Sequence, residues 1–301
     1  MASKIKICNS LNEIKEILKQ NSNAYFCLYL AYKTDADWEK STSRVYMNQL
    51  HSNFIYLPVN IEKEDHKFIE EVYRFSEENN QIVAINQTQP HKSNPVLKEW
   101  FKGKDIPTNV DCLVKDSYGK LQCFDLNGPS FVGWFTDEVD TFENRVVIIL
   151  GVGGAGEPIA RRISKEKPKQ LTLVDPLPKY RLVTELSSQS SISYSNSLEF
   201  LELTSKKELI FINCAGKEGS DDSSCQKFLS QYENTSSIFI DLRPHLNIES
   251  VELAKKLNWN AYTGYGMNAR NDYSLLQEIL NKINLSSITF EKFKELVKNA
   301  S

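Results

Sequence analysis

Residues 145–156 read RVVIILGVGGAG, an apolar run that ends in a cluster of glycines. The apolar run has the length and the β-branched content of a buried strand, and Glu157–Ser164 has the pattern of a helix. Glycine suits a tight turn and a close approach of backbone to phosphate, so Gly151, Gly153 and Gly154 are candidate cofactor residues. Strand, glycine turn and helix predict a Rossmann dinucleotide-binding domain. A glycine turn with a purely structural role is the alternative.

An acidic residue ends the next predicted strand, Leu171–Asp175, 24 positions after Gly151 (175 − 151). At about this offset in a Rossmann domain, a carboxylate accepts hydrogen bonds from the ribose hydroxyls of NAD. Asp175 therefore favours NAD as cofactor. Lys179 and Arg181 leave NADP as an alternative, because either cation suits a 2′-phosphate.

Strand and helix patterns alternate along the rest of the chain, which is typical of α/β proteins. Residues 109–125 differ, because two apolar runs flank Ser-Tyr-Gly and predict a hairpin, hence a mixed sheet in the first half. Asn127-Gly128-Pro129 interrupts the pattern and predicts a connection between domains. The other predicted strands are 24–31, 54–61, 82–88, 209–215, 237–242 and 261–264, and the other predicted helices are 44–52, 65–78, 273–283 and 289–299.

Composition excludes several classes of protein. The chain has 36 Lys and Arg residues against 39 Asp and Glu, a net charge of −3, and no dense basic stripe, so a nucleic-acid partner is not expected. Its apolar runs are too short to cross a membrane, and its first residues lack the apolar core of a secretory signal, which predicts a cytoplasmic protein. The six cysteines show no metal-ligand spacing, so free thiols and no metal are expected.

A polar turn in the first half suggests a family. Asn86-Gln-Thr88-Gln-Pro90-His91-Lys92 resembles the N-x-T-x-P-H-K segment of the shikimate and quinate dehydrogenases. In that family the lysine is the catalytic group and the threonine contacts the substrate. The resemblance implies these roles for Lys92 and Thr88.

Further segments resemble the same family in the same order. Ser41-Thr-Ser43 is similar to a segment whose two serines bind the substrate carboxylate, although the Pro and His that follow in the family are absent. Paired hydroxyls near a helix N-terminus also suit an anion on physical grounds, with an ordinary helix N-cap as the alternative. The glycine turn resembles G-A-G-G-A and Gly264-Tyr-Gly266-Met267 resembles G-x-G-M, whose methionine lies beside the nicotinamide. The resemblance adds these cofactor residues: Ala155, Asn213, Gly264 and Met267.

Two positions depart from the family. Its catalytic aspartate in N-T-D-G is aligned with Asn127, and its substrate-binding asparagine in A-V-N-T is aligned with Asp111. We interpret this as an exchange in which Asp111 keeps Lys92 charged and oriented, while Asn127 forms hydrogen bonds but takes no proton. A solvated hairpin aspartate is the alternative. The family's glutamine after G-x-G-M is aligned with Asn271, and Arg243 is a candidate carboxylate partner or a structural salt bridge.

The resemblance implies a two-domain α/β fold. Residues 1–128 would form an α/β substrate domain with a mixed sheet, residues 129–269 the Rossmann domain that binds NAD(P), and helices in 270–301 would return to the first domain. The implied activity is hydride transfer between NAD(P) and a small cyclic hydroxy, keto or amino carboxylic acid in a specialised pathway, by a monomer or homodimer. Chemistry on an imine or amine is one rival. A catalytically degenerate sensor or scaffold that binds nucleotide or metabolite is the other.

Overall fold

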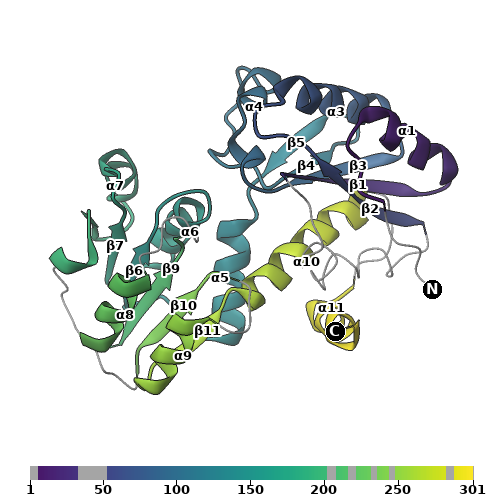
Figure 1. The fold of residues 1–301 in the computed structure, drawn as a ribbon. Helices are drawn as coiled ribbons and strands as arrows, with labels where there is room; N and C mark the ends of the chain where they lie inside the picture. The colour runs from purple at the N-terminus through teal and green to yellow at the C-terminus, as the bar shows by residue number, and fades with distance from the viewer. Residues whose placement is uncertain are drawn as a thin grey trace. The chain divides into compact units, whose positions relative to one another are not determined.

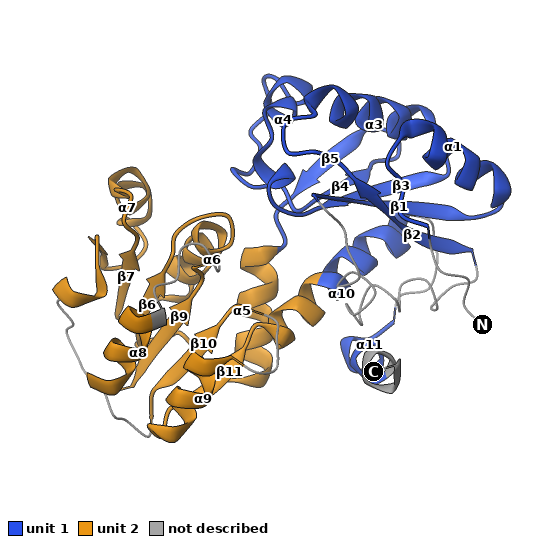
Figure 2. Ribbon diagram, in the orientation of Figure 1, with its two compact units in different colours: residues 1–126, 272–301 blue, residues 127–271 orange. Residues whose placement is uncertain are grey.

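The structure is a computed structural model of the chain, and it describes residues 6–32, 53–201, 208–215, 222–231, 236–243, 248–282 and 288–300 (Figure 1). The chain divides into two compact units (Figure 2). Unit 1 contains residues 1–126 and 272–301, and unit 2 contains residues 127–271. Each predicted strand is present. Apart from the hairpin, which was predicted as one segment, the strands begin and end within three residues of their predicted bounds.

Unit 1 contains a five-stranded mixed sheet in the order β2-β1-β3-β4-β5. The first three strands pair in parallel, and β4 and β5 add antiparallel, so the predicted hairpin and mixed sheet are confirmed. Parallel strands covered on both faces need apolar side chains on both, which explains the continuous apolar run of β1. The strands are β1 (Tyr25–Ala31), β2 (Phe54–Asn60), β3 (Ile82–Gln87), β4 (Cys112–Lys115) and β5 (Leu121–Phe124).

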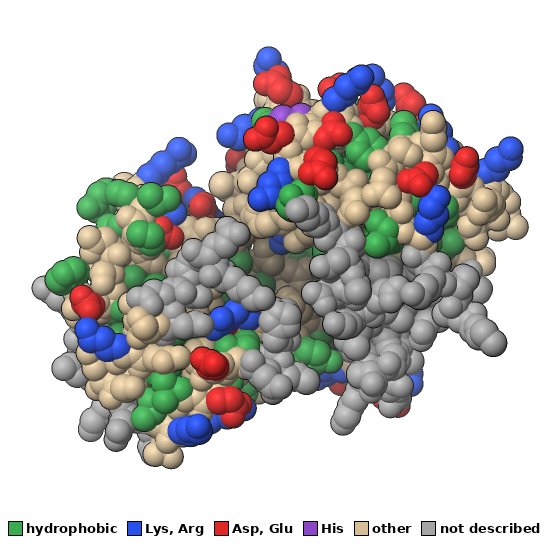
Figure 3. All heavy atoms as spheres, viewed as in Figure 1, with side chains coloured by type: hydrophobic (Ala, Val, Ile, Leu, Met, Phe, Trp, Pro, Cys, Tyr) green, Lys and Arg blue, Asp and Glu red, His purple; other side chains and the backbone are tan. Residues whose placement is uncertain are grey.

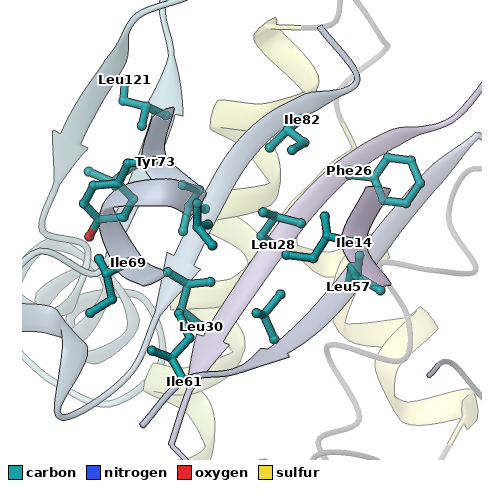
Figure 4. Packing of buried hydrophobic residues seen from close by; sticks show 14 of the residues in the cluster. Ile14, Phe26, Leu28, Leu30, Leu57, Ile61, Ile69, Tyr73, Ile82 and Leu121 are labelled. Carbon is teal, nitrogen blue, oxygen red and sulfur yellow. The ribbon is translucent and has the colours of Figure 1, made fainter. Parts of the chain in front are cut away.

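Three helices of unit 1, at residues 11–20, 66–78 and 95–100, pack on this sheet through one cluster of aliphatic and aromatic side chains (Figure 4). Side-chain caps start these helices: Ser10 accepts a hydrogen bond from the N–H of Glu13, and Asp65 from the N–H of Phe68. Helix α1 and helix α4 were not predicted from the sequence, and the predicted helix 44–52 lies outside the described residues. The helices are α1 (Leu11–Gln20), α3 (His66–Glu78), η1 (His91–Ser93), α4 (Pro95–Trp100) and α11 (Phe290–Ala300).

Unit 2 contains a six-stranded parallel sheet in the order β11-β10-β9-β6-β7-β8. Strand order runs outward from β6 in both directions, which is the Rossmann arrangement and puts the topological switch point between β6 and β9. The predicted fold class is therefore confirmed. The strands are β6 (Val146–Leu150), β7 (Gln170–Val174), β8 (Ile192–Ser195), β9 (Leu209–Asn213), β10 (Ile238–Asp241) and β11 (Asn260–Thr263).

Two apolar clusters cover the two faces of the unit 2 sheet. One packs the sheet against α5, α6, α7 and the start of α10, and the other against α8 and α9. The helices, some of which were not predicted, are α5 (Asn127–Glu138), α6 (Gly156–Ile163), α7 (Tyr180–Leu186), α8 (Asp222–Gln231) and α9 (Glu249–Lys256), with short 3₁₀ helices η2 (Ser164–Glu166) and η3 (Leu198–Phe200). Helix α10 (Tyr265–Lys282) begins in unit 2 and continues into unit 1 after Asn271.

The chain passes from unit 1 to unit 2 at residues 126–127, where the sequence predicts a connection between domains. Residues 127–129 are nevertheless helical and form the first turn of α5, where Pro129 is tolerated because early helical N–H groups have no intrahelical acceptor. Helix α10 begins at Tyr265, before the predicted start at residue 273. Gly266 lies inside this helix and does not break it. A Cβ at this position would lie 2.0 Å from the indole nitrogen of Trp134, so glycine is needed for the close packing of α10 against this side chain.

Among the described helices, none combines the length and the apolar character that a membrane span requires. On the face shown in Figure 3, acidic and basic side chains are interspersed over the described residues.

Truncating a buried aromatic side chain of unit 2 tests this packing. Phe211 on β9 is fully buried, with its ring centroid 4.8 Å from that of Phe228 and 5.3 Å from that of Phe239. Phe211→Ala is expected to lower the free energy of unfolding by about 3–5 kcal/mol, because it leaves a cavity. Phe200→Ala, at a side chain that is 70% exposed, is the control and is expected to change it by less than about 0.5 kcal/mol. Urea unfolding followed by circular dichroism measures both, and equal effects would contradict this packing.

Candidate functional site

Lys92 and Asp111 form an ion pair at the carboxyl end of β3 in unit 1. The chain turns after β3 into η1, which carries Lys92, while Asp111 directly precedes β4 on the neighbouring strand. The Lys92 ammonium donates to Oδ1 of Asp111, and Oδ2 accepts from the N–H of Leu126 at 2.8 Å. The Lys92 side chain is 19% exposed and that of Asp111 only 3%, so the lysine is partly accessible to solvent and the carboxylate is buried.

Main-chain hydrogen bonds fix both partners of this pair. The N–H of Val110 donates to the carbonyl of Lys92 at 2.8 Å, and the N–H of Gln87 donates to the carbonyl of Asp111 at 2.9 Å. The N–H of Asp111 donates to the carbonyl of Phe124 at 3.0 Å. A buried carboxylate without a partner lowers the stability of the fold. The ion pair therefore stabilises the backbone arrangement that brings Lys92 and Asp111 together. The solvated hairpin aspartate considered above is thereby excluded for Asp111.

The other predicted substrate residues of the first half are only partly described. Thr88 starts the turn that leads to Lys92: its N–H donates to the carbonyl of Leu30 at 3.1 Å, and its carbonyl accepts from the N–H of His91 at 2.8 Å. Ser41 and Ser43 lie outside the described residues. A substrate contact of Thr88 stays a prediction.

The glycine turn of unit 2 follows β6 at the switch point. Gly151 has φ +83°, and a Cβ there would lie 2.6 Å from the nitrogen of Ala215, just beyond β9. A Cβ on Gly156 would lie 1.9 Å from the carbonyl oxygen of Gly151. A Cβ on Gly153, by contrast, meets no heavy atom of the described residues within 4 Å. Gly151 and Gly156 are therefore required by packing, whereas Gly153 keeps a space open beside the turn.

Gly156 was missed as a site residue by the sequence prediction, which named Gly154 and Ala155 in this part of the turn. The signal was present, because Gly151, Gly153 and Gly156 occupy the first, third and sixth positions of a complete G-x-G-x-x-G motif. Ala155 directly precedes α6, and Gly156 is the first residue of that helix. The sixth position is where glycine permits close packing of helix and strand.

Asp175 follows β7 and is tied to the glycine turn. Its Oδ2 accepts from the N–H of Val152 at 2.7 Å, and its Oδ1 accepts from the N–H of Leu177 at 2.9 Å. The Nζ atom of Lys179 lies 3.7 Å from Oδ2 of Asp175. Each carboxylate oxygen can accept more than one hydrogen bond, so these contacts leave acceptor capacity for a ribose hydroxyl. The fold places the acid beside the turn, as a dinucleotide site requires.

A buried polar cluster lies at the carboxyl ends of β9 and β10. Asp241 is fully buried, and its oxygens accept from the amide of Asn213 at 2.9 Å and from Nε and Nη2 of Arg243 at 2.9 and 2.7 Å. Arg243 thus forms the structural salt bridge that was one of its two predicted roles, and its substrate contact stays a prediction. Burial raises the pKa of the nearby Cys214 thiol, with a further contribution from Asp241, so a thiolate is disfavoured there at neutral pH.

The remaining predicted residues also lie in unit 2. The amide of Asn271 donates to the side-chain oxygen of Asn127 at 3.0 Å, so the structure brings these two together. Met267 is 4% exposed and packs in the apolar cluster with α5 and α6. A Cβ on Gly264 would lie 2.0 Å from the carbonyl oxygen of Leu242, which explains this glycine by packing.

The residues of unit 2 fit a nicotinamide dinucleotide. In Rossmann domains an open glycine turn, a helix N-terminus and a carboxylate after the second strand receive the pyrophosphate and the ribose. Gly153, the start of α6 and Asp175 provide features of this kind. Within the described ranges, no three or more His, Cys, Asp or Glu side chains are grouped so that they could hold a metal ion.

Comparison with known proteins agrees with this arrangement. The 5-ketofructose reductase of Gluconobacter sp. strain CHM43 superposes with a TM-score of 0.66 at 16% identity, over 92% of this chain and 99% of that one. The shikimate 5-dehydrogenase of Listeria monocytogenes, crystallised with shikimate and NAD, gives a TM-score of 0.66 at 16% identity, over 91% of this chain and 96% of that one. The chain has the shikimate dehydrogenase fold.

Sequence similarity covers less of the chain. The NADP-dependent shikimate dehydrogenase of Alkaliphilus metalliredigens is 26% identical over 96 residues, which are 31% of this chain and 33% of the relative. No protein-family model matches the chain. The resemblance to the shikimate and quinate dehydrogenases inferred from the motifs is confirmed, as that of a divergent sequence.

Two glycines of the turn should respond differently to the same substitution. Gly156→Ala is expected to lower the melting temperature by several degrees, because its methyl group would overlap a backbone oxygen that cannot move without distorting the turn. Gly153→Ala is expected to leave it within about 1–2 °C, because its methyl enters open space. Differential scanning fluorimetry measures both. Equal losses in the two variants would contradict this description of the turn.

Proposed function

We propose that this protein is an NAD(P)-dependent oxidoreductase that transfers a hydride between the nicotinamide and a small cyclic hydroxy, keto or amino carboxylic acid. The observation that carries the proposal is the ion pair of Lys92 and Asp111 at the end of β3. A lysine ammonium held by a buried carboxylate is a suitable proton donor to a carbonyl oxygen that gains a hydride. The class of substrate is supported by the relative crystallised with shikimate and NAD, which shares the fold.

The cofactor proposed is NAD, with NADP as the alternative. When bound, the cofactor supplies the hydride acceptor or donor. The chain's own contribution would be to hold it: the N-terminus of α6 and the space at Gly153 would receive the pyrophosphate, and Asp175 would accept hydrogen bonds from the adenosine ribose. A carboxylate at Asp175 disfavours a 2′-phosphate, while Lys179 at 3.7 Å from it would offset part of that repulsion.

Proton transfer is assigned to Lys92. In the reducing direction its ammonium gives a proton to the substrate oxygen as that oxygen gains negative charge, and in the oxidising direction the neutral amine takes the proton back. Asp111 orients the ammonium through Oδ1 and is itself fixed by the N–H of Leu126. Asn127, at the family's aspartate position, would form hydrogen bonds to a substrate hydroxyl without taking a proton.

The carboxylate partner of Lys92 favours an enzyme over a degenerate sensor. The main support for a sensor was the loss of a carboxylate at position 127. Lys92 nevertheless has a carboxylate partner, supplied by Asp111, so the pair needed for proton transfer is present in exchanged form. Chemistry on an imine or an amine remains a variant of the same mechanism, because Lys92 would then exchange its proton with nitrogen.

Turnover tests the proposal directly. The purified protein, mixed with each reduced or oxidised nicotinamide nucleotide and a panel of cyclic hydroxy, keto and amino carboxylic acids, is expected to change the nicotinamide absorbance. Lys92→Arg keeps the positive charge opposite Asp111 but cannot release a proton at neutral pH, so kcat should fall by about 100-fold or more while the nucleotide still binds. Lys98→Arg, at an exposed lysine of α4, is the matched control and should keep wild-type kcat.

Two results would count against the proposal. Nucleotide binding by the wild-type protein with no turnover on any member of the panel would favour the sensor. Wild-type turnover in Lys92→Arg would remove Lys92 from the mechanism. Asp111→Asn tests the role of Asp111 separately from that of Lys92. It should lower kcat if Asp111 orients the ammonium and leave kcat unchanged if it does not.

A further inference from the structure

In unit 1, buried hydrogen bonds form a ring that is completed by the main chain between His91 and Lys92. The hydroxyl of Tyr73 on α3 donates to Oε1 of Gln87 at 2.8 Å, and Nε2 of Gln87 donates to the carbonyl of Val110 at 2.9 Å. The N–H of Val110 donates to the carbonyl of Lys92 at 2.8 Å. Asn94 closes the ring, since its Nδ2 donates to the carbonyl of His91 and, at 3.2 Å, to the hydroxyl oxygen of Tyr73.

The three side chains of this ring are almost entirely removed from solvent. Tyr73 is fully buried, Gln87 is 1% exposed and Asn94 is 5% exposed. Figure 4 shows Tyr73 packed with the aliphatic side chains of the unit 1 cluster. Burial raises the pKa of the Tyr73 hydroxyl, which therefore stays protonated and keeps its role as donor.

Each polar atom in the ring has its orientation determined by its partners. A tyrosine hydroxyl has one hydrogen, which goes to Gln87, so it must accept from Asn94. A flipped Gln87 amide would set its oxygen against the carbonyl of Val110, so only one orientation satisfies both contacts. The hydroxyl of Tyr73 joins the side-chain amides of Gln87 and Asn94.

The ring contacts the main chain beside both halves of the ion pair. Beside Lys92, the carbonyls of His91 and Lys92 accept from Nδ2 of Asn94 and from the N–H of Val110. Beside Asp111, the carbonyl of Val110 accepts from Nε2 of Gln87. The main chain of Gln87 also donates to the carbonyl of Asp111. Small displacements of a proton donor reduce its catalytic efficiency strongly, so a device that fixes this geometry has a functional consequence.

We propose that Tyr73 is a positioning residue for Lys92, acting through Gln87 and Asn94 without contact with the substrate. The catalytic part of this inference rests on the proposed function of Lys92. Its structural part, that the Tyr73 hydroxyl holds the backbone at residues 91–92 and 110–111, stands independently and is measured separately.

Tyr73→Phe removes the hydroxyl and keeps the ring of the side chain. The control is Ser76→Ala, which removes another buried hydroxyl from the same helix, one that donates to the carbonyl of Val72 and belongs to no part of the ring. In Tyr73→Phe, amide hydrogen exchange at residues 92 and 110–111 should quicken by about tenfold, and kcat should fall by about tenfold with the KM for the nucleotide unchanged. Ser76→Ala should leave exchange at these residues and kcat at wild-type values.

A second comparison uses Gln87→Leu, which breaks the ring at its next member. If the ring acts as a unit, Tyr73→Phe combined with Gln87→Leu should reduce kcat no more than the worse of the two single variants. The inference is overturned if Tyr73→Phe lowers only the melting temperature while exchange at residues 92 and 110–111 and kcat remain as in the wild type. If the wild-type protein has no turnover, the proposed function fails, and the exchange rates still decide the positioning claim.

Discussion

The passage from β6 into α6 depends on one close approach of backbone to backbone. Gly151 passes against Ala215 at the end of β9, and Gly156 passes against the carbonyl of Gly151, at distances that exclude any side chain. This approach lets the helix start directly at the switch point of the parallel sheet, where its free N–H groups are available. Asp175 is held in place by the same turn through the N–H of Val152. The candidate cofactor site of unit 2 therefore follows from the absence of side chains at two positions.

Unit 1 uses a different constraint, which is the cost of burying charge. Asp111 is almost inaccessible to water, so its carboxylate must be paired, and Lys92 and the N–H of Leu126 supply the partners. The pairing in turn determines the orientation of the most exposed member, the Lys92 ammonium. The carboxylate that pairs with Lys92 is at position 111 in this chain, whereas the resemblance places the family's aspartate at position 127. The proposed mechanism assigns the same role to the carboxylate at either position.

Local patterns predicted most of the fold and part of the site. The apolar strands, the hairpin around Ser-Tyr-Gly and the glycine turn are specified by residues close together in sequence, so alternation and turn chemistry were sufficient to find them. Strand β8 was missed because its four residues, ISYS, are mostly polar and only partly buried. The start of α10 was placed at residue 273 and not at Tyr265, and the first turn of the helix contains Gly266, a poor helix former that is explained by close packing.

Contacts between distant segments could not be predicted in the same way. The Lys92–Asp111 pair was anticipated only because two departures from the family pattern compensated each other. Tyr73, Gln87 and Asn94 carry no motif, and their association depends on how α3 packs on the sheet. The salt bridge of Arg243 with Asp241 was left open for the same reason, since two residues two positions apart do not reveal from sequence whether they face each other.

Calorimetric titration with NADH tests most directly whether unit 2 holds a nicotinamide dinucleotide at the open side of its glycine turn. The wild-type protein is expected to bind NADH saturably at one site. Gly153→Ala, whose methyl would occupy the space beside the turn, is expected to bind at least about tenfold more weakly. Equal affinity in the two proteins, or no binding by the wild type, would contradict the account.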